Sequence, residues 1–320
     1  MSIDARNALP ITLATMVCAC ATVGETPGDD GEADVGVMSG PPDYTATRYP
    51  IVLLPGILGF EELLGAVEYF PGIPDALAAG GADVYVVYGS QVNSSRVRAD
   101  QIIPQLEEIL VATGAGKLNL IAHSQGAVDA RIIAAERPDL VASVTSIGGA
   151  HRGAPLADKV LDGSLTPLAA PAFGALADLM TLMAGSNEPN DVNAAMTAMS
   201  TAGMAQFNAQ HPAGLPTDAC GHGAAEVGGI RFYSWSGIGS LTNPVDLLDP
   251  IWVLGSLVTG PDSDGMIPRC SSHLGVVIRD DYRMNHLDET NMVFGLVAPF
   301  GPRQTVLYRT HANRLRNAGL

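Results

Sequence analysis

The residues with the clearest potential for chemistry surround one serine. Ser124 follows the apolar run 118–121 and precedes the Ala-rich stretch 126–136, with Ala122 and Gly126 two positions away on either side. In a nucleophile elbow, the serine occupies a strained turn between a strand and a helix, and small residues at these two positions let the backbones pass. The pattern predicts a nucleophilic Ser124; the alternative is an ordinary serine in a β–α turn.

A serine hydroxyl is a weak nucleophile unless a histidine takes its proton and a carboxylate orients that histidine. In folds with such an elbow, the acid and then the histidine follow the serine along the chain. Of seven histidines, His123 and His151 come too early in the chain, and His211 and His222 fall in the predicted cap and beside Cys220. The remaining candidates are His273, His286 and His311. Asp262 and Asp264 lie upstream of them, and Asp264 with Gly265 predicts a tight turn after the strand-like run 254–258, where a carboxylate could face the site. Any one of these histidines could instead have a structural role.

The elements that must position these residues show two alternating patterns. Apolar runs without polar alternation predict buried strands at 50–54, 84–87, 118–121, 141–147 and 230–233. Between them, residues 97–113 carry an apolar face at helical spacing, and 126–136 is rich in Ala. Buried strands separated by helices indicate a mostly parallel sheet with helices on both faces, the α/β class.

The stretch from about 164 to 212 departs from this alternation and predicts a helical cap, or lid. It is rich in Ala, Met and Leu and lacks strand signals. Two apolar stripes stand at helical spacing: Leu176, Leu179, Met180 and Met183, then Met196, Met199, Met204 and Phe207. One interpretation is a pair of core-facing helices. The other is a mobile cap whose soft Met and Leu surface covers an apolar acyl pocket.

Length and charge favour one large domain. The chain has 320 residues, of which 47% are hydrophobic, and a formal net charge of −16. This charge argues against nucleic acid or an anionic membrane as a partner. Residues 22–46 are acidic and rich in Gly and Pro, which predicts a disordered linker before a domain spanning 47–320.

The first 21 residues predict an export signal. Arg6 precedes an apolar run that closes on small residues and is too short to span a membrane. Cleavage after Ala21 would release a secreted protein, whereas the run 17–20 resembles a lipoprotein box in which Cys20 would be lipidated. Outside this segment only Cys220 and Cys270 remain, an even pair that could form a disulfide or stay as two buried thiols.

From Tyr49 to Leu320 the chain resembles the secreted triacylglycerol lipases of the Pseudomonas and Burkholderia type, which have the α/β-hydrolase fold. Besides the elbow, the matching segments are Tyr49-Pro50-Ile51-Val52-Leu53, Gly59-Phe60, Arg137-Pro138-Asp139-Leu140, Tyr233-Ser234-Trp235-Ser236-Gly237, Arg269-Cys270-Ser271-Ser272, Met284-Asn285-His286-Leu287-Asp288-Glu289 and His311-Ala312-Asn313-Arg314-Leu315. The matches cover nearly all of the predicted domain.

The resemblance implies a role for each residue of the site. It implies a triad of Ser124, Asp264 and His286, with the oxyanion held by the backbone amides of Ile57 and Gln125. It also implies a disulfide between Cys220 and Cys270.

The resemblance further implies one structural Ca²⁺, bound by two carboxylates and two backbone carbonyls. Asp288 and the carbonyls of Met292 and Leu296 match the segment after the histidine. For the second carboxylate, Asp249 matches by motif and Asp246 by ungapped spacing; we favour Asp249. Hard oxygen ligands of this kind suit Ca²⁺.

The chain departs from the family pattern near the predicted oxyanion hole. Pro55-Gly56 replaces the usual His-Gly after the first strand, Ala122 replaces a Gly of the elbow, and Gln125 replaces a common His. The change to Pro55 bears on the geometry of the oxyanion loop, whereas neither of the other two changes removes a catalytic group.

The resemblance predicts hydrolysis of carboxylic esters, most of all triacylglycerols, at an oil–water interface by a monomeric enzyme. A lipase-specific foldase chaperone is a partner that such proteins often require. The alternatives are a short-chain esterase or aliphatic polyesterase and, more remotely, a non-catalytic hydrolase-like binding protein.

Overall fold

A computed structural model describes residues 41–59, 62–63, 67–165, 190–292 and 296–320. The predicted signal at 1–21 and most of the predicted linker lie outside these residues. Residues 41–46, which the sequence placed in the linker, belong to the folded part. Thr45 is buried there, and its backbone amide donates to the Gly80 carbonyl at 2.9 Å. The linker prediction therefore extended too far toward the C-terminus, because composition does not report such backbone pairing.

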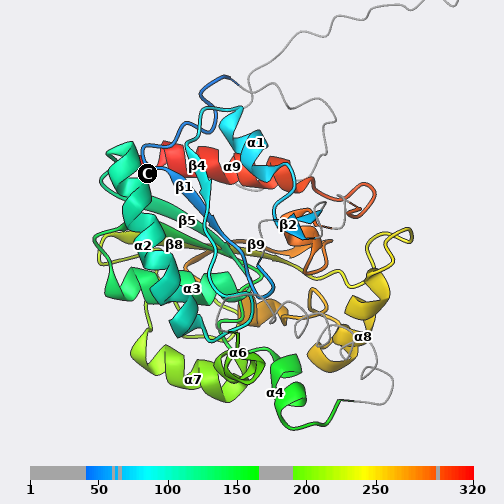
Figure 1. Cartoon of the computed structure of the whole chain (residues 1–320). Helices are drawn as coiled ribbons and strands as arrows, with labels where there is room; N and C mark the ends of the chain where they lie inside the picture. Colours follow the sequence, from blue (N-terminus) through cyan, green and yellow to red (C-terminus); the bar gives the residue numbers. More distant parts are fainter. Residues whose placement is uncertain (1–40, 60–61, 64–66, 166–189, 293–295) are drawn as a thin grey trace, which may run out of the picture. The chain divides into compact units, whose positions relative to one another are not determined.

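A mostly parallel sheet forms the centre of this part of the chain (Figure 1). Its strands are β1 (Ile51–Leu54), β4 (Val84–Val86), β5 (Leu118–His123), β6 (Val141–Ile147), β7 (Glu226–Val227), β8 (Ile230–Gly237) and β9 (Val276–Tyr282). The order is β4-β1-β5-β6-β8-β7, and β9 also pairs with β8. Only β7 runs antiparallel to its neighbour within this described sheet. The five predicted buried strands are present, and β7 and β9, which the sequence analysis did not predict, are added.

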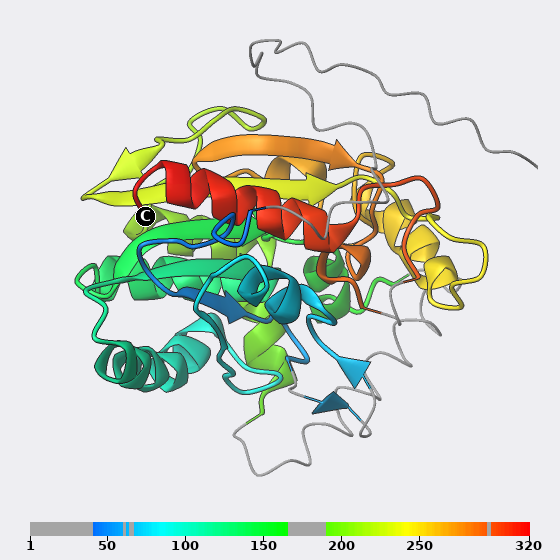
Figure 2. The ribbon, with the colours of Figure 1, turned by 90° about the horizontal axis from the view of Figure 1, so that it is seen from above.

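Helices cover both faces of the sheet, as the unalternating strands predicted. On one face, α2 (Ser95–Thr113) and α3 (Gln125–Glu136) pack on Val52, Leu54 and Leu120. On the other, α1 (Ile73–Ala78) and α9 (Gln304–Asn317) pack on Ile51, Leu53 and Ile121. Figure 2 shows α9, in red, lying over the sheet and running roughly along its strands. Successive residues of one strand thus face opposite cores.

Local signals explain where the long helix α2 begins and ends. The Ser94 side chain accepts a hydrogen bond from the Val97 amide, and Gly114 ends the helix with φ 68°. A hydroxyl at the N-cap pairs a free amide of the first turn, and glycine adopts this left-handed conformation at low cost. The helix therefore starts two residues before the predicted position.

Smaller elements surround the carboxyl ends of the strands. They are α4 (Pro155–Leu161), α6 (Val192–Met199), α7 (Thr201–Gln210), α8 (Asp249–Thr259), the 3₁₀ turns η1 (Arg269–Ser272) and η2 (Asp288–Thr290), and the antiparallel pair of β2 (Glu62–Leu63) and β3 (Val67–Glu68). The run 254–258, predicted to be strand-like, is helical within α8. Short apolar runs do not distinguish a strand from a helix, and here eleven consecutive residues form the helix.

The predicted cap divides between described and undescribed residues. The first stripe, 176–183, lies outside the described residues. In the second, Met196, Met199 and Met204 are buried, which fits core-facing helices for α6 and α7. No helix of the described chain is long and apolar enough to cross a membrane.

Candidate active site

Ser124 stands at a sharp turn between β5 and α3. Its backbone has φ 55° and ψ −126°, a conformation that costs free energy for a residue with a side chain. The crowding explains the small neighbours. A Cβ on Gly126 would lie 2.6 Å from the Pro55 carbonyl oxygen, and one on Gly56 would lie 2.6 Å from the Ser124 Cβ. The turn therefore has the form of the predicted elbow.

Three side chains form a continuous hydrogen-bonded row at this turn. Ser124 Oγ lies 2.8 Å from His286 Nε2, and His286 Nδ1 lies 2.7 Å from Asp264 Oδ2. The other Asp264 oxygen accepts from the amides of Met266 and Ile267 at 2.8 and 2.6 Å. These bonds hold the carboxylate in place, so that it can orient the imidazole against the serine.

The other two candidate histidines are engaged elsewhere. His273 Nε2 lies 2.9 Å from Asp280 Oδ2, and His311 Nε2 lies 2.7 Å from Thr145 Oγ1. Neither has a contact with Ser124 among the described interactions. The structure thus brings only His286 of the three to the serine.

Among the described backbone hydrogen bonds, none is donated by the amide of Ile57 or of Gln125. Gln125 begins α3, and Ile57 lies in the turn after β1. That turn is fixed by a bond from the Leu58 amide to the Gln91 carbonyl at 2.7 Å and from the Gly59 amide to the Gly56 carbonyl at 3.1 Å. Free amides at a helix start and a fixed turn can hold a developing oxyanion.

Pro55 is accommodated by a buried arginine that the sequence did not reveal. Arg98 Nη2 donates to the Pro55 carbonyl at 2.7 Å, and Nη1 donates to the Ser90 carbonyl at 2.5 Å. Its Nε donates to Asp129 of α3 at 2.7 Å, and both side chains are fully buried. Arg98 therefore links the oxyanion turn to the helix that begins after Ser124. A lone arginine in an amphipathic helix gave no signal of this role.

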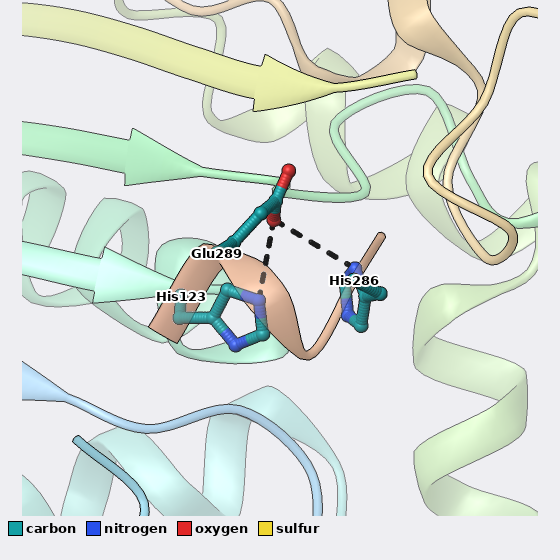
Figure 3. Close-up of side chains that lie close together, drawn as sticks. All are labelled: His123, His286 and Glu289. Carbon is teal, nitrogen blue, oxygen red and sulfur yellow. Dashed lines mark ion pairs between the residues drawn. The ribbon is translucent and has the colours of Figure 1, made fainter. Parts of the chain in front are cut away.

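Beneath the triad lies a second buried group of polar side chains, which the sequence analysis did not assign. Figure 3 shows the Glu289 carboxylate between His123 and His286. Glu289 Oε2 lies 3.3 Å from His123 Nε2 and 3.9 Å from His286 Nδ1, and Oε1 accepts from the Gly237 amide at 2.7 Å. His123 Nδ1 lies 2.7 Å from the Tyr69 hydroxyl.

Burial governs the protonation of this group. Loss of solvation, with the charge of His286 nearby, lowers the pKa of His123 well below its usual value. Burial and then the charge of Asp264 raise the pKa of Glu289 well above the ordinary range. Burial also raises the pKa of the Tyr69 hydroxyl. For the position of Glu289 in this buried group, the sequence offered only one local sign, namely that Glu289 belongs to a segment that matches the lipase family.

The carboxylates predicted to bind calcium lie next to the histidine loop. Asp249 accepts from the Thr242 and Asn243 amides at 2.7 Å each, and Asn285 Nδ2 donates to its other oxygen at 2.7 Å. The Asn285 amide also donates to Asp288 at 3.1 Å. Asn285, which directly precedes His286, therefore bonds to both carboxylates.

The remaining predicted ligands are less directly connected. Asp246 is buried, and its side chain accepts from the Leu248 amide at 2.7 Å. Burial raises the pKa of Asp288 to about 7. Met292 is buried and Leu296 is partly exposed, and residues 293–295 between them lie outside the described chain.

Cys220 and Cys270 form a disulfide in the structure. Cys270 lies in η1, where Arg269 pairs with Asp280 at 2.7 Å. The cross-link therefore fixes the segment that follows the Asp264 turn.

Comparisons with known proteins agree with this geometry. Residues 49–243 match the family described as the alpha/beta hydrolase fold. A triacylglycerol lipase from Vibrio cholerae serotype O1 is 48% identical over 87% of this chain and 90% of its own length. One from Pseudomonas fragi is 42% identical over 87% of this chain and 99% of its length.

Solved structures show the same fold at low sequence identity. A metagenomic carboxyl esterase superposes with a TM-score of 0.59 at 19% identity, covering 85% of this chain and 76% of its own. The mature form of a Bacillus licheniformis lipase gives a TM-score of 0.59 at 15% identity, covering 85% and 93%.

Proposed function

The chain belongs to the α/β-hydrolase family and, within it, to the bacterial triacylglycerol lipases, and we propose that Ser124, His286 and Asp264 perform its ester hydrolysis. The observation that supports this assignment is the row of bonds at 2.8 and 2.7 Å that joins the three side chains. It has the geometry that an activated serine requires.

The reaction follows from this geometry in two steps. His286 accepts the Ser124 proton as the oxygen attacks the ester carbonyl, and it then protonates the leaving alcohol, which leaves an acyl-enzyme. Water activated by the same imidazole releases the fatty acid. In both steps the Ile57 and Gln125 amides hold the negative oxygen, and Asp264 keeps the imidazole oriented.

Replacement of the serine tests the assignment. Ser124→Ala should retain the fold and lose both ester hydrolysis and labelling by a fluorophosphonate. His286→Gln should lose hydrolysis, whereas His273→Gln, which removes a histidine bound to Asp280, should keep it. Hydrolysis by a folded Ser124→Ala protein would overturn the proposal and would favour the alternative that Ser124 is an ordinary serine in a β–α turn.

The substrate that we propose is a triacylglycerol presented at an oil surface. Half of the large exposed apolar side chains in the described chain stand in one segment that reaches into α8: Leu241, Val245, Leu247, Leu248 and Leu257. Leu247 is 89% exposed. The segment 241–257 has no Lys or Arg, and its two acids are buried. An uncharged apolar surface suits an oil phase better than an anionic membrane.

A chain-length series separates this proposal from its alternatives. Emulsified tributyrin and triolein should be hydrolysed faster than soluble short esters at equal ester concentration. Leu247→Asp should reduce the rate on emulsions and leave the rate on soluble p-nitrophenyl butyrate unchanged. Equal loss on both substrates would contradict the surface role, and activity confined to soluble esters or to aliphatic polyesters would favour an esterase or polyesterase.

We further propose that Asp249, Asp288 and the carbonyls of Met292 and Leu296 hold a structural Ca²⁺. Both carboxylates are buried, and neither has a Lys, Arg or His partner among the described ion pairs. A hard dication would compensate these charges. Asp249 is favoured over Asp246 because Asn285 bonds to Asp249 and Asp288 together. The ion would steady the loop that carries His286 and take no part in the chemistry.

Chelation tests the calcium proposal. Removal of Ca²⁺ should lower the melting temperature and the activity together, and Ca²⁺ should restore both where Mg²⁺ does not. Asp249→Asn should weaken calcium binding more than Asp246→Asn, and the reverse ranking would reassign the ligand. A chain unaffected by chelation would refute the site.

We also propose export to an oxidising compartment. The Cys220–Cys270 disulfide supports this location, because such bonds persist outside the reducing cytosol. Expression with its own N-terminal segment, followed by mass measurement of the released protein, distinguishes cleavage after Ala21 from lipidation at Cys20. Refolding with and without a lipase-specific foldase tests the proposed chaperone.

A further inference from the structure

Three side chains beneath Ser124 place metal-binding atoms around one point. His123, His286 and Glu289 each offer one ligand atom, and these atoms lie within 4.8 Å of one another. Glu289 Oε2 is 3.3 Å from His123 Nε2 and 3.9 Å from His286 Nδ1. In Figure 3 the carboxylate points between the two rings. His123 is the last residue of β5, His286 lies in the loop that enters η2, and Glu289 lies in η2 itself.

His123 Nε2 and Glu289 Oε2 are buried and lie 3.3 Å apart as an ion pair, but neither atom makes a well-aligned side-chain hydrogen bond in the described chain. Buried polar atoms are nearly always hydrogen-bonded, so this exception needs a physical account. The opposite atom of each group is held in place. His123 Nδ1 contacts the Tyr69 hydroxyl, and Glu289 Oε1 accepts from the Gly237 amide. The two facing atoms are therefore fixed toward each other and toward His286.

The spacing suits a tetrahedral metal ion. Zinc bonds to imidazole nitrogen and carboxylate oxygen at about 2.0–2.2 Å, which separates neighbouring ligand atoms by roughly 3.3–3.6 Å in a tetrahedron. The distances of 3.3 and 3.9 Å from Glu289 Oε2 are close to this range. The ligand atoms of the two rings lie within 4.8 Å of each other, so binding would draw the rings together. Asp264 Oδ2, which lies 2.7 Å from His286 Nδ1, is within reach as a fourth ligand if this contact opens by about 0.6 Å.

Charge also favours a dication of this type. Two carboxylates and two neutral imidazoles, all buried, would together balance the charge of a dication, which avoids burying a net charge. Imidazole ligands select zinc and its neighbours over Ca²⁺ and Mg²⁺. The site therefore differs in ligand chemistry from the proposed calcium site, whose donors are all oxygens.

We propose that His123, Glu289 and His286, with Asp264, form an inhibitory Zn²⁺ site. A neutral imidazole carries one proton, so zinc on Nδ1 of His286 moves that proton to Nε2. Nε2 is the atom that must accept the Ser124 proton, and a protonated Nε2 cannot do so. The inhibitory effect, though not the binding, rests on the proposed catalytic role of His286. Because all three ligand side chains are buried, inhibition develops slowly.

The first experiment measures inhibition. The full chain is incubated with ZnCl₂ in a non-chelating buffer that contains Ca²⁺, and hydrolysis of p-nitrophenyl butyrate is followed over time. We expect a time-dependent loss of activity that a zinc-selective chelator reverses. Glu289→Gln keeps an acceptor for the Gly237 amide, and His123→Asn keeps an oxygen near the Nδ1 position, but each removes one ligand. Each should raise the inhibiting zinc concentration by at least ~10-fold, relative to its own uninhibited rate.

An exposed histidine outside the cluster supplies the control. His222 is exposed and lies outside the cluster, so His222→Asn should remain as sensitive to zinc as the parent chain. If His222→Asn loses the inhibition while Glu289→Gln and His123→Asn keep it, zinc acts from the surface and the proposal is wrong.

Direct binding is measured separately from activity. Ser124→Ala is loaded with Co²⁺, whose visible absorption is intense in tetrahedral sites and weak in octahedral ones. One tetrahedral ion per chain, lost in the Ser124→Ala/Glu289→Gln protein, supports the site even if His286 proves not to be the base. Should a variant fail to fold, anomalous scattering at the zinc edge from crystals of the parent chain decides the matter: density away from Glu289 refutes the site.

Discussion

Tyr69 gives the sharpest test of how the oxyanion turn is positioned. The Gly56 amide donates to the Tyr69 hydroxyl at 2.8 Å, and Gly56 directly precedes Ile57, whose amide is the proposed oxyanion donor. The hydroxyl also lies 2.7 Å from His123 Nδ1. Tyr69→Phe removes both bonds and keeps the ring. It leaves the Gly56 amide buried without an acceptor, which costs about 1–3 kcal/mol unless the turn moves.

Movement of the turn should be visible in catalysis. Complete loss of one oxyanion donor raises the barrier by about 3–4 kcal/mol, and a displaced Ile57 amide loses part of that. We expect an increase of about 1–3 kcal/mol, which is a roughly 5- to 150-fold fall in kcat. KM should change little, because the amide interacts with the transition state more strongly than with the bound ester.

The assay compares kcat and KM on soluble p-nitrophenyl butyrate with the affinity for a trifluoromethyl ketone. The ketone forms a tetrahedral adduct with an oxyanion, so its inhibition constant should rise by the same factor as kcat falls. Tyr308→Phe is the control, since this buried phenol also packs against Phe70 but, among the described residues, donates to the Glu289 carbonyl at 3.3 Å and not to the oxyanion turn. If Tyr69→Phe loses stability yet keeps kcat within about twofold of the parent, the bond to Gly56 is structural only.

Three further predictions follow from the same geometry. Arg98→Met leaves the buried Asp129 carboxylate without its partner and should lower the free energy of unfolding, measured in urea, by ~3–5 kcal/mol. The double variant Arg98→Met/Asp129→Leu should regain most of this stability, and no recovery would contradict the pairing. Gly126→Ala puts a Cβ 2.6 Å from a backbone carbonyl oxygen and should lower kcat. Gly116→Ala, which places its Cβ in open space, should leave kcat unchanged. Equal kcat values for the two variants would show that the elbow can shift to accept a Cβ. Burial and a neighbouring guanidinium lower the pKa of His311 well below its usual value. The unfolded chain therefore binds a proton there below about pH 6.5 that the folded chain does not, so stability falls with acidification. His311→Gln should reduce that slope by up to ~1.4 kcal/mol per pH unit, and an unchanged slope would mean that His311 is charged when folded.

The sequence predicted those features that depend on local pattern. Unalternating apolar runs located β1, β5 and β6, and small residues at 122 and 126 located the elbow, because period and side-chain size act over a few residues. Chain order and the position of the predicted cap left three histidines open, and the resemblance selected His286. The run 254–258 was placed in a strand because a short apolar run fits either element.

The features that local pattern could not predict depend on contacts between distant segments. Arg98 reaches Pro55 across 43 positions, and Tyr69 reaches His123 across 54. Nothing in the spacing of these residues indicates that they meet. Their positions follow from the order in which the strands pair, which is a property of the whole sheet.

That strand order also explains why the two halves of the site differ in how they are built. Because β1 pairs directly with β5, the turn after one strand and the elbow after the other meet at the same edge of the sheet. The histidine loop instead follows β9, and β8 and β6 separate β9 from β5. It must therefore pass over the ends of two strands to reach Ser124. At those ends stand Gly148 and Gly237, where a Cβ would overlap the Glu289 carboxylate and the Met284 carbonyl respectively. Glycine at these two positions is what allows the loop to cross, so a bulkier residue at either one should displace His286 while leaving the elbow and the oxyanion turn in place.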